Sequence, residues 1–190
     1  MRSAIIGTLV VVFAAAAAPS ARAQGFVSPF IGYNFGGDSG CPTATNCSDK
    51  RLNAGVAVGA MGSLLGIEEE FAYAKDFFGT APDHSSSVLT LMTNLMIVPK
   101  IGPVAPYVLA GAGLFKTHVD FAASSLLTTD NNNLGWDVGG GLIVFVSQHV
   151  GVRGDLRYFH SFQDLNVAGF TLSNPKLDFG RASAALALKF

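Results

Sequence analysis

The chain has 190 residues, which is the size of one domain and leaves no room for a second once an export signal is removed. Charged residues make up 13% of it, against about 25% in a typical soluble domain, and the formal net charge is −1. So few charges argue against a water-facing surface, and the lack of a basic excess argues against nucleic acid as a partner. Residues after Ala23 also contain no run of about 18 apolar residues for a transmembrane helix, so a membrane protein of this sequence would have to be a closed β-barrel.

The N-terminal 23 residues have the composition of a secretory signal peptide. Arg2 precedes an apolar run from Ile5 to Ala18, and Ala21-Arg22-Ala23 is typical of a cleavage site. The apolar run is shorter than the roughly 20 residues that span a bilayer. We therefore expect residues 1–23 to be removed and residues 24–190 to form the mature domain.

Eight segments of the mature chain are rich in Gly, Val, Leu, Phe and Thr and have the length of a tilted membrane strand. In chain order they are Phe26–Gly36, Arg51–Gly62, Ile67–Phe78, Ser87–Val98, Val104–Thr117, Leu134–Val146, Gly151–Gln163 and Lys176–Phe190. Long polar segments at 37–50, 79–86, 118–133 and 164–175 alternate with short turns at 63–66, 99–103 and 147–150. Four long outer loops and three short inner turns predict an all-β fold, an eight-stranded antiparallel up-and-down transmembrane barrel with both termini in the periplasm.

Alternation along the strands predicts which side chains face lipid. The segment 151–163 sets Val152 and Leu156 against Arg153 and Arg157, and segments 134–146 and 176–190 alternate in the same way. The segment 104–117 has apolar residues on both faces, so its facing stays open. A soluble barrel that carries a ligand would invert this arrangement. The low charge, the loop asymmetry and the apolar final segment favour the membrane barrel.

Several short motifs carry a family resemblance over essentially the whole mature chain. They are Ser28-Pro29-Phe30-Ile31-Gly32, Glu69-Glu70-Phe71-Ala72-Tyr73, Pro106-Tyr107-Val108, Gly111-Ala112-Gly113 and Ala187-Leu188-Lys189-Phe190. With these motifs the chain resembles the small outer-membrane proteins of the OmpA/OmpX-like β-barrel group. The resemblance implies an integral outer-membrane protein, exported through the secretory pathway, that contacts outer-membrane lipid and lipopolysaccharide. Leu186, Leu188 and the terminal Phe190 resemble the signal that the barrel-assembly machinery reads.

A polar network is expected inside the barrel. Its expected members are Glu68, Glu70, Asp137, Arg153, Asp155, Arg157 and Arg181. An eight-stranded barrel is only wide enough for its side chains to fill it, so buried charges there should be paired in salt bridges. The alternative is a polar path for protons or small ions, and the facing of Glu68 and Glu70 is not fixed by the local pattern.

Cys41 and Cys47 are the only cysteines, and both fall in the first expected outer loop. Outside the cytosol they are expected to form a disulfide. Asp38 and Asp49 are the only further ligands nearby, so neither a metal nor another cofactor is expected.

The adjacent residues His160 and Ser161 suggest a lipid-modifying nucleophile, with Asp164 as the orienting acid. Neighbouring strand residues point to opposite faces, however, and the His-x-Ser spacing of outer-membrane deacylases is missing. No catalytic residue is therefore predicted.

Aromatic residues near strand ends or on the lipid-facing parity are expected to form girdles at headgroup level. They are Tyr33, Phe35, Tyr73, Phe77, Phe78, Tyr107, Trp136, Tyr158 and Phe190. Together these features predict a non-enzymatic outer-membrane scaffold with four external loops that serves envelope integrity or surface contact. A narrow porin-like pore for ions or small solutes, a lipid-modifying enzyme and a soluble periplasmic carrier remain alternatives, and the sequence identifies no external ligand.

Overall fold

The computed structural model describes residues 23–37, 52–75, 77, 84–121, 128–162, 166–167, 170–171 and 177–190. The expected signal peptide apart from Ala23, both cysteines and Asp164 lie outside these described residues. Within the described ranges, no helix is long and apolar enough to cross a bilayer.

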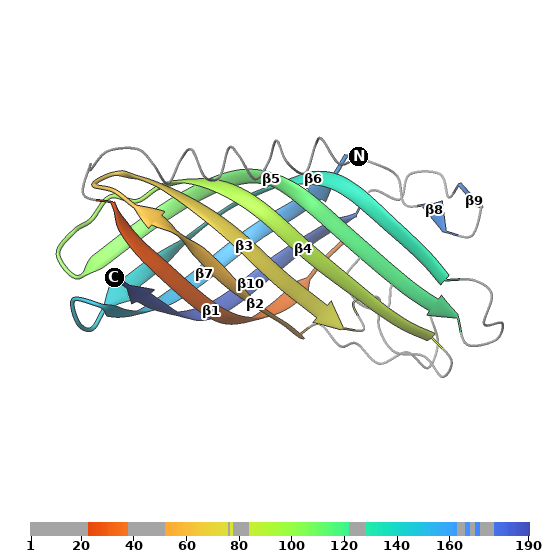
Figure 1. Ribbon diagram of the computed structural model, residues 1–190, viewed down its shortest axis with the longest axis horizontal. Helices are drawn as coiled ribbons and strands as arrows, with labels where there is room; N and C mark the ends of the chain where they lie inside the picture. Colours follow the sequence, from red (N-terminus) through yellow and green to blue (C-terminus); the bar gives the residue numbers. More distant parts are fainter. Residues whose placement is uncertain are drawn as a thin grey trace.

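Eight antiparallel strands close into a barrel (Figure 1). They are β1 (Gln24–Phe35), β2 (Leu52–Met61), β3 (Leu65–Lys75), β4 (His84–Ile97), β5 (Val104–Phe121), β6 (Thr128–Phe145), β7 (Val150–Ser161) and β10 (Asp178–Lys189). Each of these strands pairs with the next one along the chain, and β1 pairs with β10 to complete the ring. The predicted eight-stranded up-and-down barrel is therefore confirmed. Two short strands, β8 (Asn166–Val167) and β9 (Phe170–Thr171), pair only with each other in the expected fourth loop.

Short turns join the strands at the end of the barrel where Phe190 lies (Figure 1). The Gly62 amide donates to the Leu65 carbonyl over 2.8 Å, and the Val146 amide donates to the Val150 carbonyl over 2.9 Å. Gly102 has a φ of +63°, a conformation that glycine adopts without the clash of a side chain. We call this the inner end, and the opposite end the outer end.

At the outer end, β5 and β6 run beyond their neighbours as a two-stranded stem. They pair as far as Asp120 with Thr128, whereas the pairing of β6 with β7 stops at Gly135 with Ser161. The expected loop over 118–133 is therefore wrong at both of its margins, because residues 118–121 and 128–133 are strand. Residues 128–133 are all polar, so the alternation that marks a one-sided strand is missing there, whereas His118-Val119-Asp120-Phe121 continues the alternation of β5.

The register of the eight strands fixes their tilt. A path along paired residues that starts at Leu188 on β10 goes once around the barrel and returns to β10 at Asp178, ten residues away. The pairs are Leu188 with Val27, Val27 with Val58, Val58 with Glu69, Glu69 with Thr93, Thr93 with Ala112, Ala112 with Trp136, Trp136 with His160, and His160 with Asp178. This stagger corresponds to a strand tilt of about 40°. Ten residues at about 3.3 Å each span about 33 Å along a strand. At this tilt the path rises about 25 Å along the barrel axis, which is about the height of the apolar band of outer-membrane barrels.

Apolar side chains cover the outer wall, as the alternation predicts. In β7, Val152 and Leu156 are exposed, while Arg153 and Arg157 are buried inside the barrel. In β5, whose facing the sequence leaves open, Tyr107 and Phe115 point inward. A soluble carrier would have apolar side chains inside the barrel and polar side chains outside. The strands of this barrel have the opposite arrangement.

The aromatic residues divide between the outer wall and the interior. Tyr33, Tyr73 and Tyr158 lie on the wall and are 41–48% exposed. The girdle assignment is wrong for Phe77 and Tyr107, which are 1% and 3% exposed, because their side chains fill the interior instead. Phe78 lies outside the described residues.

Candidate functional site: the lumenal charge network

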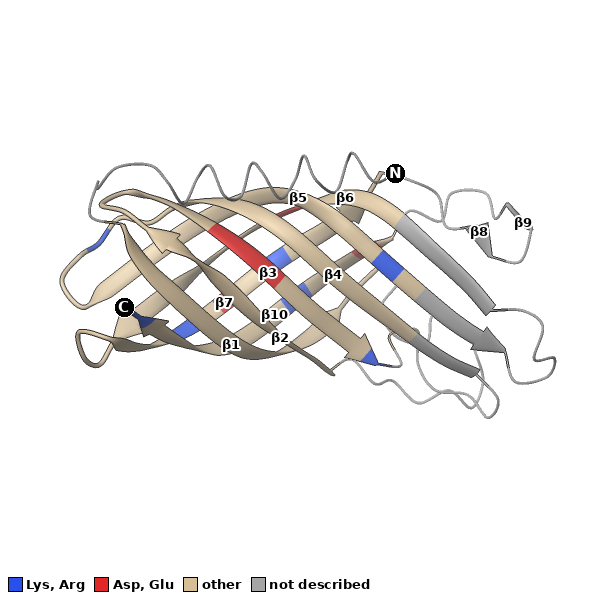
Figure 2. Cartoon of the chain, viewed as in Figure 1, with Lys and Arg blue, Asp and Glu red and all other residues tan. Residues whose placement is uncertain are grey.

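Two apolar layers lie inside the barrel, one toward each end. The layer toward the inner end consists of Phe26, Met61, Met96, Val98, Ala105, Tyr107, Leu109, Ile143 and Ala187, with Phe145 packed against it. The layer toward the outer end consists of Ala74, Phe77, Val88, Met92, Phe115, Phe159, Leu177 and Phe179. Charged side chains from β3, β6, β7 and β10 lie between the layers, and Figure 2 shows the acidic residues of β3 near the middle of that strand.

Arg153 connects the inner apolar layer to the charged residues. Its Nε donates to the Tyr107 hydroxyl over 2.6 Å, and its guanidinium lies 4.7 Å from the centre of the Tyr107 ring. The same guanidinium pairs with Glu68 through Nη1 and with Asp155 through Nη2, the latter over 2.8 Å. The Tyr107 hydroxyl in turn donates to Asp155. Each group therefore has charge-assisted partners that offset its removal from water.

Arg157 is the centre of the network because it contacts all four acidic members. Its Nε donates to Asp155 over 2.6 Å and its Nη2 to Glu68 over 2.7 Å. Nη2 also lies 3.0 Å from a Glu70 oxygen, and Nη1 lies 3.4 Å from Asp137 Oδ2. These contacts join residues of three strands, β3, β6 and β7, across the lumen.

Two further contacts extend the network toward the outer end. Arg181 Nη1 donates to Glu70 over 2.8 Å, and its guanidinium lies 4.5 Å from the centre of the Phe159 ring. The Asn94 amide, oriented with its nitrogen toward Asp137, donates to Oδ1 over 2.7 Å and accepts from Arg157 Nη1 over 3.1 Å. All seven sequence-predicted lumenal residues are thus brought together in one connected set.

Glycines on the inward face of β6 make room for these long side chains. A Cβ at Gly139 would lie 2.7 Å from Arg157 Cγ, and one at Gly141 would lie 2.5 Å from the Tyr107 hydroxyl oxygen. Larger residues at these two positions would displace the groups that form the network. The Gly-rich sequence of β6 is therefore explained by side-chain packing across the lumen.

The network fills its part of the lumen. The cavity beside Arg153, Asp155 and Arg157 has a volume of about 10 Å³, which is about the space of one water molecule. Four carboxyl groups face three guanidinium groups here, and all seven side chains are almost completely buried. Among the described residues, no group of three or more His, Cys, Asp or Glu side chains has a geometry that could hold a metal ion.

The nucleophile pair considered from the sequence does not form in the structure. Ser161 is buried on the inward face, where its Oγ accepts a hydrogen bond from the Leu177 amide over 2.9 Å. His160 lies on the outer wall against the Trp136 ring, and its Nδ1 is 2.5 Å from an Asp178 oxygen. Because the two side chains are on opposite faces of β7, His160 cannot activate Ser161.

The residues of the expected assembly signal lie together on the outer wall of β10 and its end. Leu186, Leu188 and Phe190 are 52%, 40% and 75% exposed. The Phe190 amide donates to the Gly25 carbonyl over 2.9 Å, which extends the seam between the first and last strands.

Sequence reasoning missed two members of the network. The position of Tyr107 near the end of its segment predicts a girdle residue instead, and no motif in the sequence analysis includes Asn94. Asn94 is the one amide in the mostly apolar segment Leu91-Met92-Thr93-Asn94-Leu95-Met96-Ile97, and a buried polar residue in such a segment needs a partner. That isolation was the available signal.

A closed barrel with an apolar exterior, a paired polar interior and a strand stagger that corresponds to a rise of about 25 Å, close to the thickness of the lipid hydrocarbon, has the features of a transmembrane β-barrel. The chain matches the family described as "Outer membrane protein beta-barrel domain" over residues 6–190, and it belongs to that family. It is an integral protein of the outer membrane, where its wall is in contact with lipid and lipopolysaccharide. The search of curated proteins found no match.

Several solved outer-membrane barrels have a similar fold. Neisserial surface protein A has a TM-score of 0.65 and 17% sequence identity, with 87% of this chain and 97% of that chain covered. OprG from Pseudomonas aeruginosa has a TM-score of 0.55 and 16% identity, covering 88% and 96%. Ail, the attachment invasion locus protein of Yersinia pestis, has a TM-score of 0.54 and 12% identity, covering 88% and 97%. At these identities the likeness concerns the fold alone.

Proposed function

We propose that this protein is a non-enzymatic, non-conducting scaffold of the outer membrane. The observation that carries the proposal is the filled interior, in which two apolar layers enclose a network with a cavity of only about 10 Å³. Water and ions need a continuous polar path to cross, and the apolar layers interrupt any such path. The position of Ser161, whose Oγ is buried and bonded to the Leu177 amide, also supports a role without nucleophilic catalysis.

In this proposal, the outer end of the barrel makes the contact with the cell's surroundings. The stem of β5 and β6 extends seven residues past the last pair of β6 with β7, from Gly135 to Thr128. This corresponds to a projection on the order of 20 Å beyond the neighbouring strand. Two proteins of similar fold are named for a cell-surface location and for attachment and invasion, and a projecting stem would suit a surface contact in this protein too.

Conductance measurements separate the scaffold from the pore. Refolded protein inserted in a planar bilayer is expected to give no discrete current steps, because no hydrated path crosses the two apolar layers. Insertion is checked by heat-modifiable gel mobility of protein recovered from matched vesicles, and a large porin in the same bilayer serves as the positive control. Reproducible unitary steps from the folded protein would establish the pore and overturn the scaffold.

We also propose that Leu186, Leu188 and Phe190 form the signal for the barrel-assembly machinery. Their side chains lie exposed in a row on the wall of the final strand, where another protein can reach them before the barrel closes. Phe190→Ser is expected to lower the amount of protein in the outer membrane while leaving refolding in detergent intact. Equal outer-membrane yields for the variant and the parent would contradict this role.

A further inference from the structure

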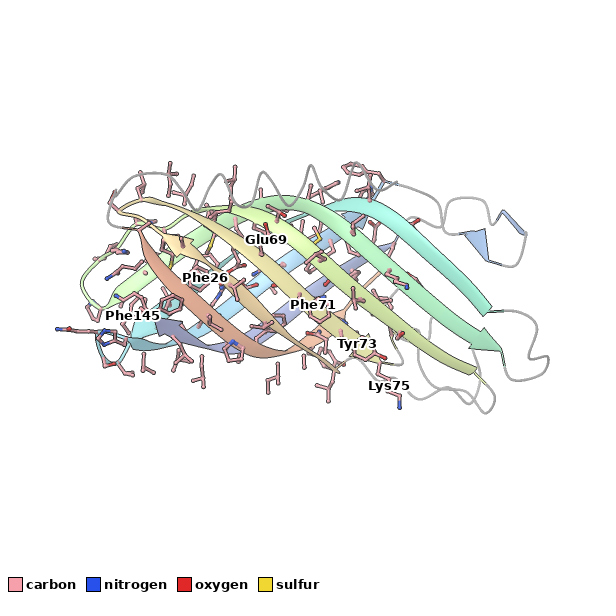
Figure 3. All side chains as sticks on the ribbon, in the orientation of Figure 1. Phe26, Glu69, Phe71, Tyr73, Lys75 and Phe145 are labelled. Atoms are coloured by element: carbon pink, nitrogen blue, oxygen red, sulfur yellow. The ribbon has the colours of Figure 1, made fainter. Side chains whose placement is uncertain are left out.

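Among the described residues, one carboxyl group lies on the outer wall far from both ends of the barrel. Glu68 and Glu70 point into the lumen, so Glu69 between them points outward, and Figure 3 shows it on β3 with Phe71, Tyr73 and Lys75 following toward the outer end. Its Oε2 accepts a hydrogen bond from the Thr93 hydroxyl of β4 over 2.9 Å. Thr93 is the only hydrogen-bonding partner of Glu69 among the described residues.

The register places Glu69 and Thr93 near the middle of the membrane. On the paired path that climbs from Leu188 at the inner end to Asp178 at the outer end, they are the fourth and fifth of nine residues. The path rises about 25 Å, so both residues lie on the order of 10 Å from the nearest end of the apolar band. The other acidic, basic and histidine side chains that the structure describes on the wall, Lys75, Lys116, His160 and Asp178, are toward the outer end.

Apolar side chains surround this polar pair. Val58, Phe71 and Leu91 are 42–44% exposed, and Leu95 is 70% exposed. An ionisable residue facing hydrocarbon is costly and is usually found where it meets another protein group. The scaffold role does not account for it, because a leucine at this position would suit lipid better.

We propose that the wall formed by β2, β3 and β4 around Glu69 and Thr93 is the interface with a second copy of this chain. A two-fold contact places the same patch on both copies, so that each Glu69–Thr93 pair faces the pair of its partner. The patch is complementary to itself, because a hydroxyl both donates and accepts, and a carboxyl group that carries its proton does the same. Four such groups can satisfy one another where lipid offers none. The surrounding leucine, valine and phenylalanine side chains pack around this polar centre.

The association is measured by energy transfer between labelled copies in lipid vesicles. Ser63→Cys in the inner turn, on a Cys41→Ser/Cys47→Ser background, takes the donor or the acceptor dye. Glu69→Leu and Thr93→Val are each expected to lower the association constant about tenfold, the size of two polar contacts between membrane segments, because each change is present in both copies. Glu69→Gln, which keeps a donor and an acceptor, should retain association. Leu156→Ala, on the wall of β7 opposite β3 in the ring, is the matched control and should leave association unchanged.

Heat-modifiable gel mobility shows whether a variant that no longer associates is still folded. Glu69→Leu should fold at least as well as the parent, so its loss of association would come from the lost contact. A disulfide test then locates the contact: on the Cys41→Ser/Cys47→Ser background, Leu95→Cys should cross-link two copies on oxidation and Leu156→Cys should not. Parent protein that shows only the energy transfer of random proximity would overturn the proposal. So would association that persists unchanged in both Glu69→Leu and Thr93→Val, because the interface would then lie on another wall.

Discussion

Replacing Arg157 by alanine is expected to lower the free energy of unfolding by about 3–5 kcal/mol, because the change leaves buried carboxylates without their counter-charge. Arg157 contacts Glu68, Glu70, Asp137 and Asp155, and its own side chain is almost fully buried. Its removal would leave four carboxyl groups facing only two guanidinium groups. The loss would therefore exceed that of any single pair in the network.

Urea titration of protein refolded in vesicles, with the folded fraction read from gel mobility, measures this change. Lys116→Ala is the matched control, because it also removes a cation but from the exposed wall of β5, where surface substitutions usually change stability by less than about 0.5 kcal/mol. Equal unfolding midpoints for Arg157→Ala and Lys116→Ala would contradict the central role of Arg157.

Replacing Phe179 by alanine is expected to destabilise the barrel by about 3–5 kcal/mol through the cavity it leaves in the outer apolar layer. The Phe179 ring stacks on Phe159 with a centroid distance of 4.8 Å and meets the edge of Phe77 at 4.9 Å. Its side chain is 1% exposed, and strands on both sides hold the surrounding residues in place. Little collapse around the missing ring is therefore expected.

The same urea titration tests this prediction, with Phe162→Ala as the control. Phe162 is 59% exposed at the end of β7, so the loss of its ring removes few buried contacts. If the two alanine variants unfold at the same urea concentration, the outer apolar layer does not contribute as a packed core.

The strand alternation, together with the low charge, the loop asymmetry and the apolar final segment, was sufficient to predict the barrel and the facing of most of its wall. In β7 the sequence from Val152 to Phe159 alternates without a break. A shift of this strand by one residue would turn both of its arginines, Arg153 and Arg157, toward lipid, so its facing is strongly specified. The start of β6 was not predictable in this way, because its first six residues, Thr128-Thr129-Asp130-Asn131-Asn132-Asn133, carry no alternation of polar and apolar residues.

The lumenal charges could be predicted as a group, but their contacts could not. Parity within one strand joins Arg153, Asp155 and Arg157, whereas their pairing with Glu68 depends on register across the whole ring. The outward facing of Glu69 follows from the inward facing of Glu68 and Glu70, which the local sequence pattern does not fix. The inward facing of Tyr107 was not available from its sequence, because apolar residues occupy both faces of β5.

The most direct test of the closed lumen is the reactivity of a cysteine placed inside it. Ser183→Cys lines the small cavity beside Arg157, and Ser63→Cys lies exposed in an inner turn, each on a Cys41→Ser/Cys47→Ser background. A charged, membrane-impermeant thiol reagent added to folded protein in vesicles is expected to modify the cysteine at 63 and leave the one at 183 unmodified until the protein is unfolded. Rapid modification at both positions in the folded barrel would show that water and ions enter the lumen, and would contradict the closed scaffold.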